Sequence, residues 1–159
     1  MTDSSSAVQA RELASLAQMA ALVGQEVAVT GWVAITQERV NLFADATDDH
    51  QWIHVDVERC RRESPYRAPV AHGFLTLSLI SGLFERALRM VDATMVLNYG
   101  LNKVRFPAPV PVGSRVRARL LLQAITPIEG GAQLAWQVTV EREGGDKPVC
   151  VAELLIRRY

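Results

Sequence analysis

The chain has 159 residues, of which 49% are hydrophobic and only 6% aromatic, a composition typical of one globular domain with a substantial core. Lys and Arg together number 17, and Asp and Glu also number 17. This balance excludes a global field that would favour nucleic acid or an anionic membrane surface as the main partner. We predict a single domain over residues 1–159, with the polar residues 1–10 disordered.

The sequence shows neither a targeting segment nor a cysteine pattern that indicates a function. The N-terminus lacks the apolar core of a signal peptide, and no run of about 18 purely apolar residues follows it. We therefore expect a cytoplasmic protein that does not enter a membrane. Cys60 and Cys150 match neither a disulfide framework nor a metal-ligand spacing, so neither is assigned any chemistry.

The first predicted elements are a helix, a strand and a second helix. Apolar residues recur at helical spacing before Gly24 and predict a short helix that ends there. These residues are Leu13, Leu16, Ala20 and Val23. Residues 26–37 alternate as a strand does, and Thr36 can cap a helix over residues 37–47. Residues 55–70 contain two prolines and predict a loop with one turn of helix around "VERCRRE".

The second half of the chain predicts one buried helix followed by strands. Apolar side chains point in almost every direction around a helix over residues 72–91, so this helix must be buried on most sides. Four strands follow, over residues 94–106, 114–124, 132–142 and 148–157, with hairpin-type turns before the last two. An antiparallel sheet wrapped around one long helix is an α+β arrangement known as the hotdog fold.

A cluster of ionisable residues occupies the stretch "FADATDDHQWIH", residues 43–54. His50 and His54 have the spacing of a helical metal-binding pair, with nearby carboxylates as further ligands. The residues between them do not favour a helix, and no third Cys or His cluster exists, so we predict no metal. Two interpretations remain open: a solvated acidic loop, or an Asp and a His that act on one water as acid and base.

Gly73 stands where the buried helix is predicted to begin. The first N–H groups of a helix have no partners within it, and without a side chain at Gly73 a ligand can approach them closely. Such a site favours negative charge developing on an oxygen, as in a thioester that becomes an enolate. Tight packing at a turn would explain the glycine equally well, and we expect the adjacent His72 to be structural.

Basic residues dominate the segment between Asp92 and Glu129, which contains no acidic residue. They are Lys103, Arg105, Arg115, Arg117 and Arg119. The last three alternate with apolar residues, so they share one face of a strand. This face is either solvated or a binding surface for the phosphates of an anionic substrate such as a coenzyme A thioester.

Three motifs in this order resemble one family: "DHQWIH", "RAPVAHGFLTLSLISGL" and "VRFPAPVPVGSRVR". They resemble the MaoC-like (R)-specific enoyl-coenzyme A hydratases, in particular the nodulation-protein-N-like branch, from about residue 25 to the end. The resemblance implies a homodimer of hotdog subunits that adds water to a trans-2-enoyl thioester and gives the (R)-3-hydroxyacyl product. It implies no cofactor, because coenzyme A is part of the substrate.

The resemblance also implies residue roles. Asp49 and His54 would hold and activate the water, with His54 deprotonating it and Asp49 handling the proton that reaches the α-carbon. Gly73 would donate its N–H to the thioester oxygen, and Ser81 matches a supporting hydroxyl. Gln51 stands where the family more often has Asn, and it can make the same hydrogen bonds.

The sequence differs from the family pattern at two positions, and two alternative functions remain open. Trp52 replaces a common proline, and Asp48 replaces a common glycine, which places a second carboxylate beside Asp49. A hotdog thioesterase would keep the fold and hydrolyse the substrate instead, although the Asp-x-x-x-x-His spacing argues against it. A non-catalytic acyl thioester-binding or regulatory module would keep the two residues as relics.

Overall fold

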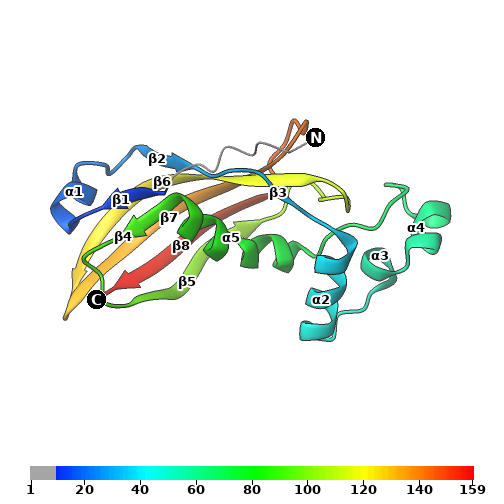
Figure 1. The fold of residues 1–159 in the computed structure, drawn as a ribbon, viewed down its shortest axis with the longest axis horizontal. Helices are drawn as coiled ribbons and strands as arrows, with labels where there is room; N and C mark the ends of the chain where they lie inside the picture. Colours follow the sequence, from blue (N-terminus) through cyan, green and yellow to red (C-terminus); the bar gives the residue numbers. More distant parts are fainter. Residues whose placement is uncertain (1–9) are drawn as a thin grey trace, which may run out of the picture.

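The computed structural model describes residues 10–159 (Figure 1). The predicted disorder of residues 1–10 lies outside these residues, apart from Ala10. The helices are α1 (Leu16–Ala20), α2 (Gln37–Thr47), α3 (Trp52–Val55), α4 (Val57–Glu63) and α5 (Gly73–Ala87). The strands are β1 (Arg11–Leu13), β2 (Glu26–Val29), β3 (Val33–Ala34), β4 (Leu88–Met90), β5 (Val96–Arg105), β6 (Arg115–Ile128), β7 (Gly131–Arg142) and β8 (Cys150–Arg158).

The main sheet is antiparallel throughout, in the order β2-β6-β7-β8-β5, and β3 also pairs with β6. β6 and β7 form the predicted hairpin, in which Ile128 pairs with Gly131 across a two-residue turn. Gly130 in this turn has a φ of 72°, in the left-handed region that glycine adopts without steric cost. The four long strands expected after the helix are thus confirmed, and β6 runs four residues further than predicted.

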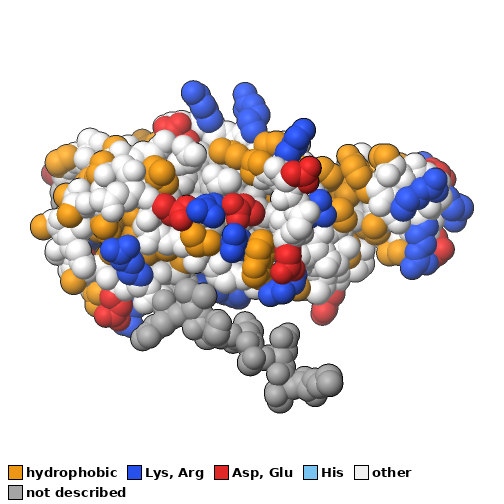
Figure 2. All heavy atoms as spheres, turned by 90° about the horizontal axis from the view of Figure 1, so that it is seen from above, with side chains coloured by type: hydrophobic (Ala, Val, Ile, Leu, Met, Phe, Trp, Pro, Cys, Tyr) orange, Lys and Arg blue, Asp and Glu red, His pale blue; other side chains and the backbone are white. Residues whose placement is uncertain are grey.

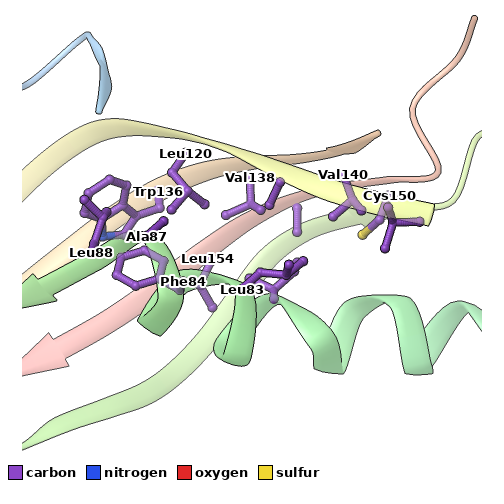
Figure 3. Packing of buried hydrophobic residues seen from close by; sticks show 14 of the residues in the cluster. Leu83, Phe84, Ala87, Leu88, Leu120, Trp136, Val138, Val140, Cys150 and Leu154 are labelled. Atoms are coloured by element: carbon purple, nitrogen blue, oxygen red, sulfur yellow. The ribbon is translucent and has the colours of Figure 1, made fainter. Parts of the chain in front are cut away.

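The core lies between α5 and one face of the sheet, as Figure 3 shows. Alternate residues of β6, β7 and β8 are buried, because successive side chains of a strand point to opposite faces. Trp136 is fully buried, and its ring meets that of Phe84 on α5 edge to face, with 5.0 Å between the centroids. A sheet packed on one central helix confirms the predicted α+β hotdog fold.

The helix α5 is buried on one side and open on the other. Leu75, Ile80 and Leu83 are buried, but Phe74 is 68% exposed. The prediction of burial on most sides is therefore wrong for the single chain, because the sheet covers only one face of the helix. No helix within residues 10–159 has the length and hydropathy needed to cross a membrane.

Pairing between distant segments changes the ends of two predicted helices. Residues 11–13 do not extend α1, and they form β1, which pairs in parallel with β4. This pairing also ends α5 at Ala87, four residues before the predicted end. The spacing of apolar residues could not reveal either change, because the partner strand lies far away in the sequence.

The segment from α2 to α4 stands beside the sheet (Figure 1). α2 begins and ends as predicted, and the Thr36 side chain accepts a hydrogen bond from the Arg39 N–H at 3.2 Å. The predicted strand over residues 26–37 is divided into β2 and β3. The loop expected over residues 55–70 contains α4, a helix of seven residues capped by Asp56.

Candidate active site

Asp49 lies in the turn that joins α2 to α3. α2 ends at Thr47, and Asp48 takes a left-handed conformation with a φ of 58°, which redirects the chain. The Gln51 N–H donates to Asp49 Oδ1 at 3.4 Å. The turn presents the Asp49 carboxylate beside α3, with half of the side chain (51%) exposed.

His54 lies on α3 and is buried, with 7% of its surface exposed. Its Nδ1 donates to the Val70 carbonyl oxygen at 2.6 Å, because a carbonyl can only accept. Nε2 of the neutral ring is therefore unprotonated and free to accept a proton. Burial lowers the pKa of His54 below 6.5, and the nearby His72 lowers it further, although the Val70 and Asp49 oxygens oppose the shift.

Asp49, His54 and His72 come together at the N-terminus of α5. One ring nitrogen of each His and one Asp49 carboxylate oxygen lie within 4.8 Å of one another. Two hydrogen bonds of about 2.8 Å meeting at one water span roughly 4.6 Å. The arrangement can therefore hold a water between a carboxylate and an unprotonated imidazole, as an acid/base pair requires.

The same three residues are the group that could hold a metal ion within the described part of the chain. Two of their four ring nitrogens already donate to carbonyl oxygens, His54 Nδ1 to Val70 and His72 Nε2 to Asp49 at 2.9 Å. His50, the other candidate ligand, pairs instead with the Asp45 carboxylate at 2.8 Å. In the neutral rings these bonds leave one unprotonated nitrogen on each histidine, as in many metal-ligating histidines, so the absence of a metal remains a prediction.

Gly73 is the first residue of α5, as predicted. Thr76 makes the first hydrogen bond within the helix, to the His72 carbonyl, so the three preceding N–H groups have no helical partner. A Cβ added at Gly73 would lie 3.0 Å from the Phe106 ring. A hollow of about 290 Å³ opens beside Gly73 and is lined in part by Thr76 and Phe106.

Ser81 is not brought next to Asp49 in the single chain. It lies eight residues after Gly73 on α5, which corresponds to about 12 Å along the helix. The Ser81 hydroxyl accepts a hydrogen bond from the Asn98 side chain at 3.0 Å. Gln51 lies exposed at the start of α3, and only its backbone N–H contacts Asp49.

The predicted phosphate-binding residues occupy two different environments. Arg115 pairs with Glu143 at 3.3 Å and Arg117 with Glu141 at 2.9 Å, on the sheet face opposite α5. Figure 2 shows acidic and basic side chains side by side on this face. This is the solvated face that was one of the two interpretations of the sequence. The ion pairs argue against phosphate binding by Arg115 and Arg117. Lys103 and Arg105 are exposed on β5.

Sequence reasoning underestimated two side chains. His72 is 3% exposed and contacts both Asp49 and His54. Phe106 covers Gly73 although the chain separates them by more than 30 residues. The adjacency of His72 to Gly73 in "AHG" was an available signal, whereas no local pattern placed Phe106 at the helix start.

The hotdog fold brings a carboxylate and an imidazole together at the N-terminus of α5, an arrangement that suits a hydro-lyase, an enzyme that adds or removes water. The comparisons with known proteins give the family. A family model described as "MaoC like domain" matches residues 18–143. The chain belongs to the MaoC-like dehydratase family, as the sequence motifs predicted.

Individual relatives agree with this assignment. The chain is 51% identical over 148 residues to 3-hydroxyacyl-thioester dehydratase Z of Mycobacterium tuberculosis, covering 92% of this chain and 97% of that protein. It is 45% identical over 141 residues to nodulation protein N of Rhizobium leguminosarum, covering 87% of each. An R-hydratase from Pseudomonas aeruginosa shares the fold with a TM-score of 0.71 and 24% identity, covering 86% of this chain and 81% of the other.

Proposed function

We propose that this protein is an (R)-specific enoyl thioester hydratase, which also catalyses the reverse dehydration of (R)-3-hydroxyacyl thioesters. The observation that carries the proposal is the grouping of the Asp49 carboxylate with His54 at the start of α5, where the Val70 carbonyl holds Nδ1 and leaves Nε2 as the unprotonated nitrogen of the neutral ring. The name of the Mycobacterium tuberculosis relative, a 3-hydroxyacyl-thioester dehydratase, supports the substrate class.

In the proposed hydration, the thioester oxygen lies against the N–H of Gly73, where the unpartnered helix N–H groups stabilise negative charge. His54 Nε2 takes a proton from the bound water, and the resulting hydroxide adds to the β-carbon. The Asp49 carboxylate takes this proton from the imidazolium of His54 and delivers it to the α-carbon. One water is consumed, and both residues return to their starting protonation states.

Hollows along α5 support an acyl chain as part of the substrate. Beyond the hollow at Gly73, one of about 210 Å³ borders Leu77 and Ser81, and one of about 340 Å³ borders Ser81 and Phe84. The last is lined mainly by apolar side chains. An extended chain leaving the thioester carbon could follow this series, because all three hollows adjoin the same helix.

Coenzyme A is the proposed carrier of the acyl group. Its phosphates require cations that are not already neutralised. Lys103 and Arg105 are exposed on β5, which leads directly to Phe106 beside Gly73. We assign the phosphates to these two residues rather than to Arg115 and Arg117.

The proposal includes a homodimer that forms along β5. This strand is the last in the sheet order, so one of its edges lacks a partner strand within the described chain. It exposes large apolar side chains: Val96, Leu97, Tyr99 and Leu101. A second copy that extends the sheet would bury these residues and cover the hollows along α5. A cytoplasmic location and the lack of any cofactor remain predictions.

The test follows the absorbance of the conjugated enoyl thioester band after purified, chelator-treated protein is mixed with crotonyl-coenzyme A and then with longer enoyl thioesters. We expect the band to decrease, with (R)-3-hydroxyacyl product and no free thiol. Release of thiol would identify a thioesterase instead. Binding without turnover over all chain lengths would identify a non-catalytic acyl thioester-binding module.

A further inference from the structure

His72 is buried beside the proposed acid/base pair but touches neither the water nor the thioester in the proposed reaction. We propose that His72 is a positioning residue, which fixes the Asp49 backbone and the His54 ring relative to the first turn of α5. The kinetic part of this inference rests on the proposed function, whereas its structural part does not.

The first contact is a hydrogen bond that crosses between two segments. His72 Nε2 donates to the Asp49 carbonyl oxygen at 2.9 Å, and the Asp49 carboxylate lies 3.9 Å from the same nitrogen. The turn that carries Asp49 is otherwise exposed to solvent. His72 immediately precedes Gly73, so this hydrogen bond connects the turn that carries Asp49 to the start of α5.

The second contact is a stack of rings. The imidazoles of His72 and His54 lie 3.7 Å apart between centroids, with 24° between their planes. The Phe43 ring lies 5.0 Å from His72 as well. His72 thus packs against side chains of α2 and α3, and together with the Val70 carbonyl it fixes the direction of His54 Nε2.

The hydrogen bond to Asp49 determines which nitrogen of the His72 ring carries the proton. Because Nε2 donates to a carbonyl, Nδ1 of the neutral ring is an acceptor, and it is buried with no hydrogen-bond partner among residues 10–159. A purely apolar ring would fill the same space without leaving a buried polar atom unpaired, but it could not hold Asp49. Burial lowers the pKa of His54 most, and the charge that His72 carries when it is protonated lowers it further.

The test compares His72→Phe, which keeps a stacking ring, with His72→Gln, which keeps an N–H donor. We expect His72→Phe to lower kcat about 10-fold to 100-fold with a nearly unchanged KM, the scale of a displaced catalytic group. His72→Gln should recover part of this loss. His50→Gln, a change to an exposed histidine that pairs with Asp45, serves as the matched control.

A second readout needs no substrate and separates this inference from the proposed function. NMR titration of His54 should show a higher pKa in His72→Phe, since one of the causes that lower it is removed while Asp49 and the Val70 carbonyl remain. The amides of residues 50–54 should exchange about tenfold faster or more. If His54 titrates as in the wild type and these amides keep their protection, the inference is overturned, whatever the hydration assay gives. If both change while the wild-type protein hydrates no thioester, only the proposed function fails.

Discussion

In the body formed by α5 and the main sheet, alternate residues of three long strands are buried, whereas the segment from α2 to α4 buries few residues. The buried residues of that segment are Val40, Ala44, His54 and Cys60. Burial of apolar surface dominates folding stability, so the body supplies most of it. The segment instead carries both proposed catalytic side chains.

A few hydrogen bonds attach the segment to the rest of the chain. The Val70 N–H donates to the Ile53 carbonyl oxygen at 2.9 Å, and the Val70 carbonyl oxygen accepts from His54 Nδ1. Within the segment, the Gln37 side chain donates to the His54 carbonyl at 2.8 Å. Each such bond contributes only about 1 kcal/mol. Changes in the segment should therefore affect activity far more than stability, and changes in the core should do the reverse.

The largest expected effect is the loss of turnover in Asp49→Asn and His54→Ala. Each should reduce kcat/KM for crotonyl-coenzyme A by roughly 100-fold to 10,000-fold, the contribution of a positioned acid or base. The melting temperature should change by only about a few degrees in either variant. His50→Ala should stay close to wild type in both kcat/KM and melting temperature. Near-normal hydration by either variant would show that these two residues do not form the acid/base pair.

A core substitution should show the opposite behaviour. Trp136→Ala should lower the free energy of unfolding by about 3–5 kcal/mol, because it leaves a cavity beside Phe84. Leu42→Ala, on the exposed face of α2, should cost only about 0.5 kcal/mol. Urea unfolding measures both, and equal losses of stability would contradict the distinction between body and segment.

Gly73→Ala tests the point where the two regions meet. We expect kcat/KM to fall about 10-fold to 100-fold, because the added methyl group occupies the approach to the helix N–H groups. The half-exposed Phe106 ring can move aside, and Ala favours the helix, so the melting temperature should change little. Gly82→Ala is the matched control, since its added Cβ meets no atom within 4 Å. A lower melting temperature with unchanged kinetics would assign Gly73 a packing role only.

The smallest expected effect concerns the two groups of basic residues. Replacing Lys103 and Arg105 together by Ala should raise KM for a coenzyme A thioester roughly threefold to tenfold, as expected for exposed charges. KM for the matching pantetheine thioester, which lacks the nucleotide phosphates, should not change. Arg115→Ala and Arg117→Ala should leave both KM values unchanged, and the reverse result would return the phosphates to the outer face of the sheet.

Local pattern was sufficient for much of the architecture. The period of apolar residues predicted α2, the start of α5 and the four long strands, because each element must bury one face or stripe. The residues alone left both a solvated loop and an acid/base pair open for Asp49 and His54, and the resemblance to the family favoured the pair beside Gly73. The match to the family model agrees with the motifs read from the chain.

Only the tertiary structure decided which side chains share the site. The pairing of β1 with β4 shortened two helices, and the glutamates opposite Arg115 and Arg117 come from β7 and the turn that follows it. The same holds for His72, whose partners are defined by how the α2–α4 segment folds back onto α5. The periods of apolar residues that predict helices and strands can be read from near neighbours in the sequence. The protonation state and direction of His54 depend on groups that become its neighbours only when the chain is folded.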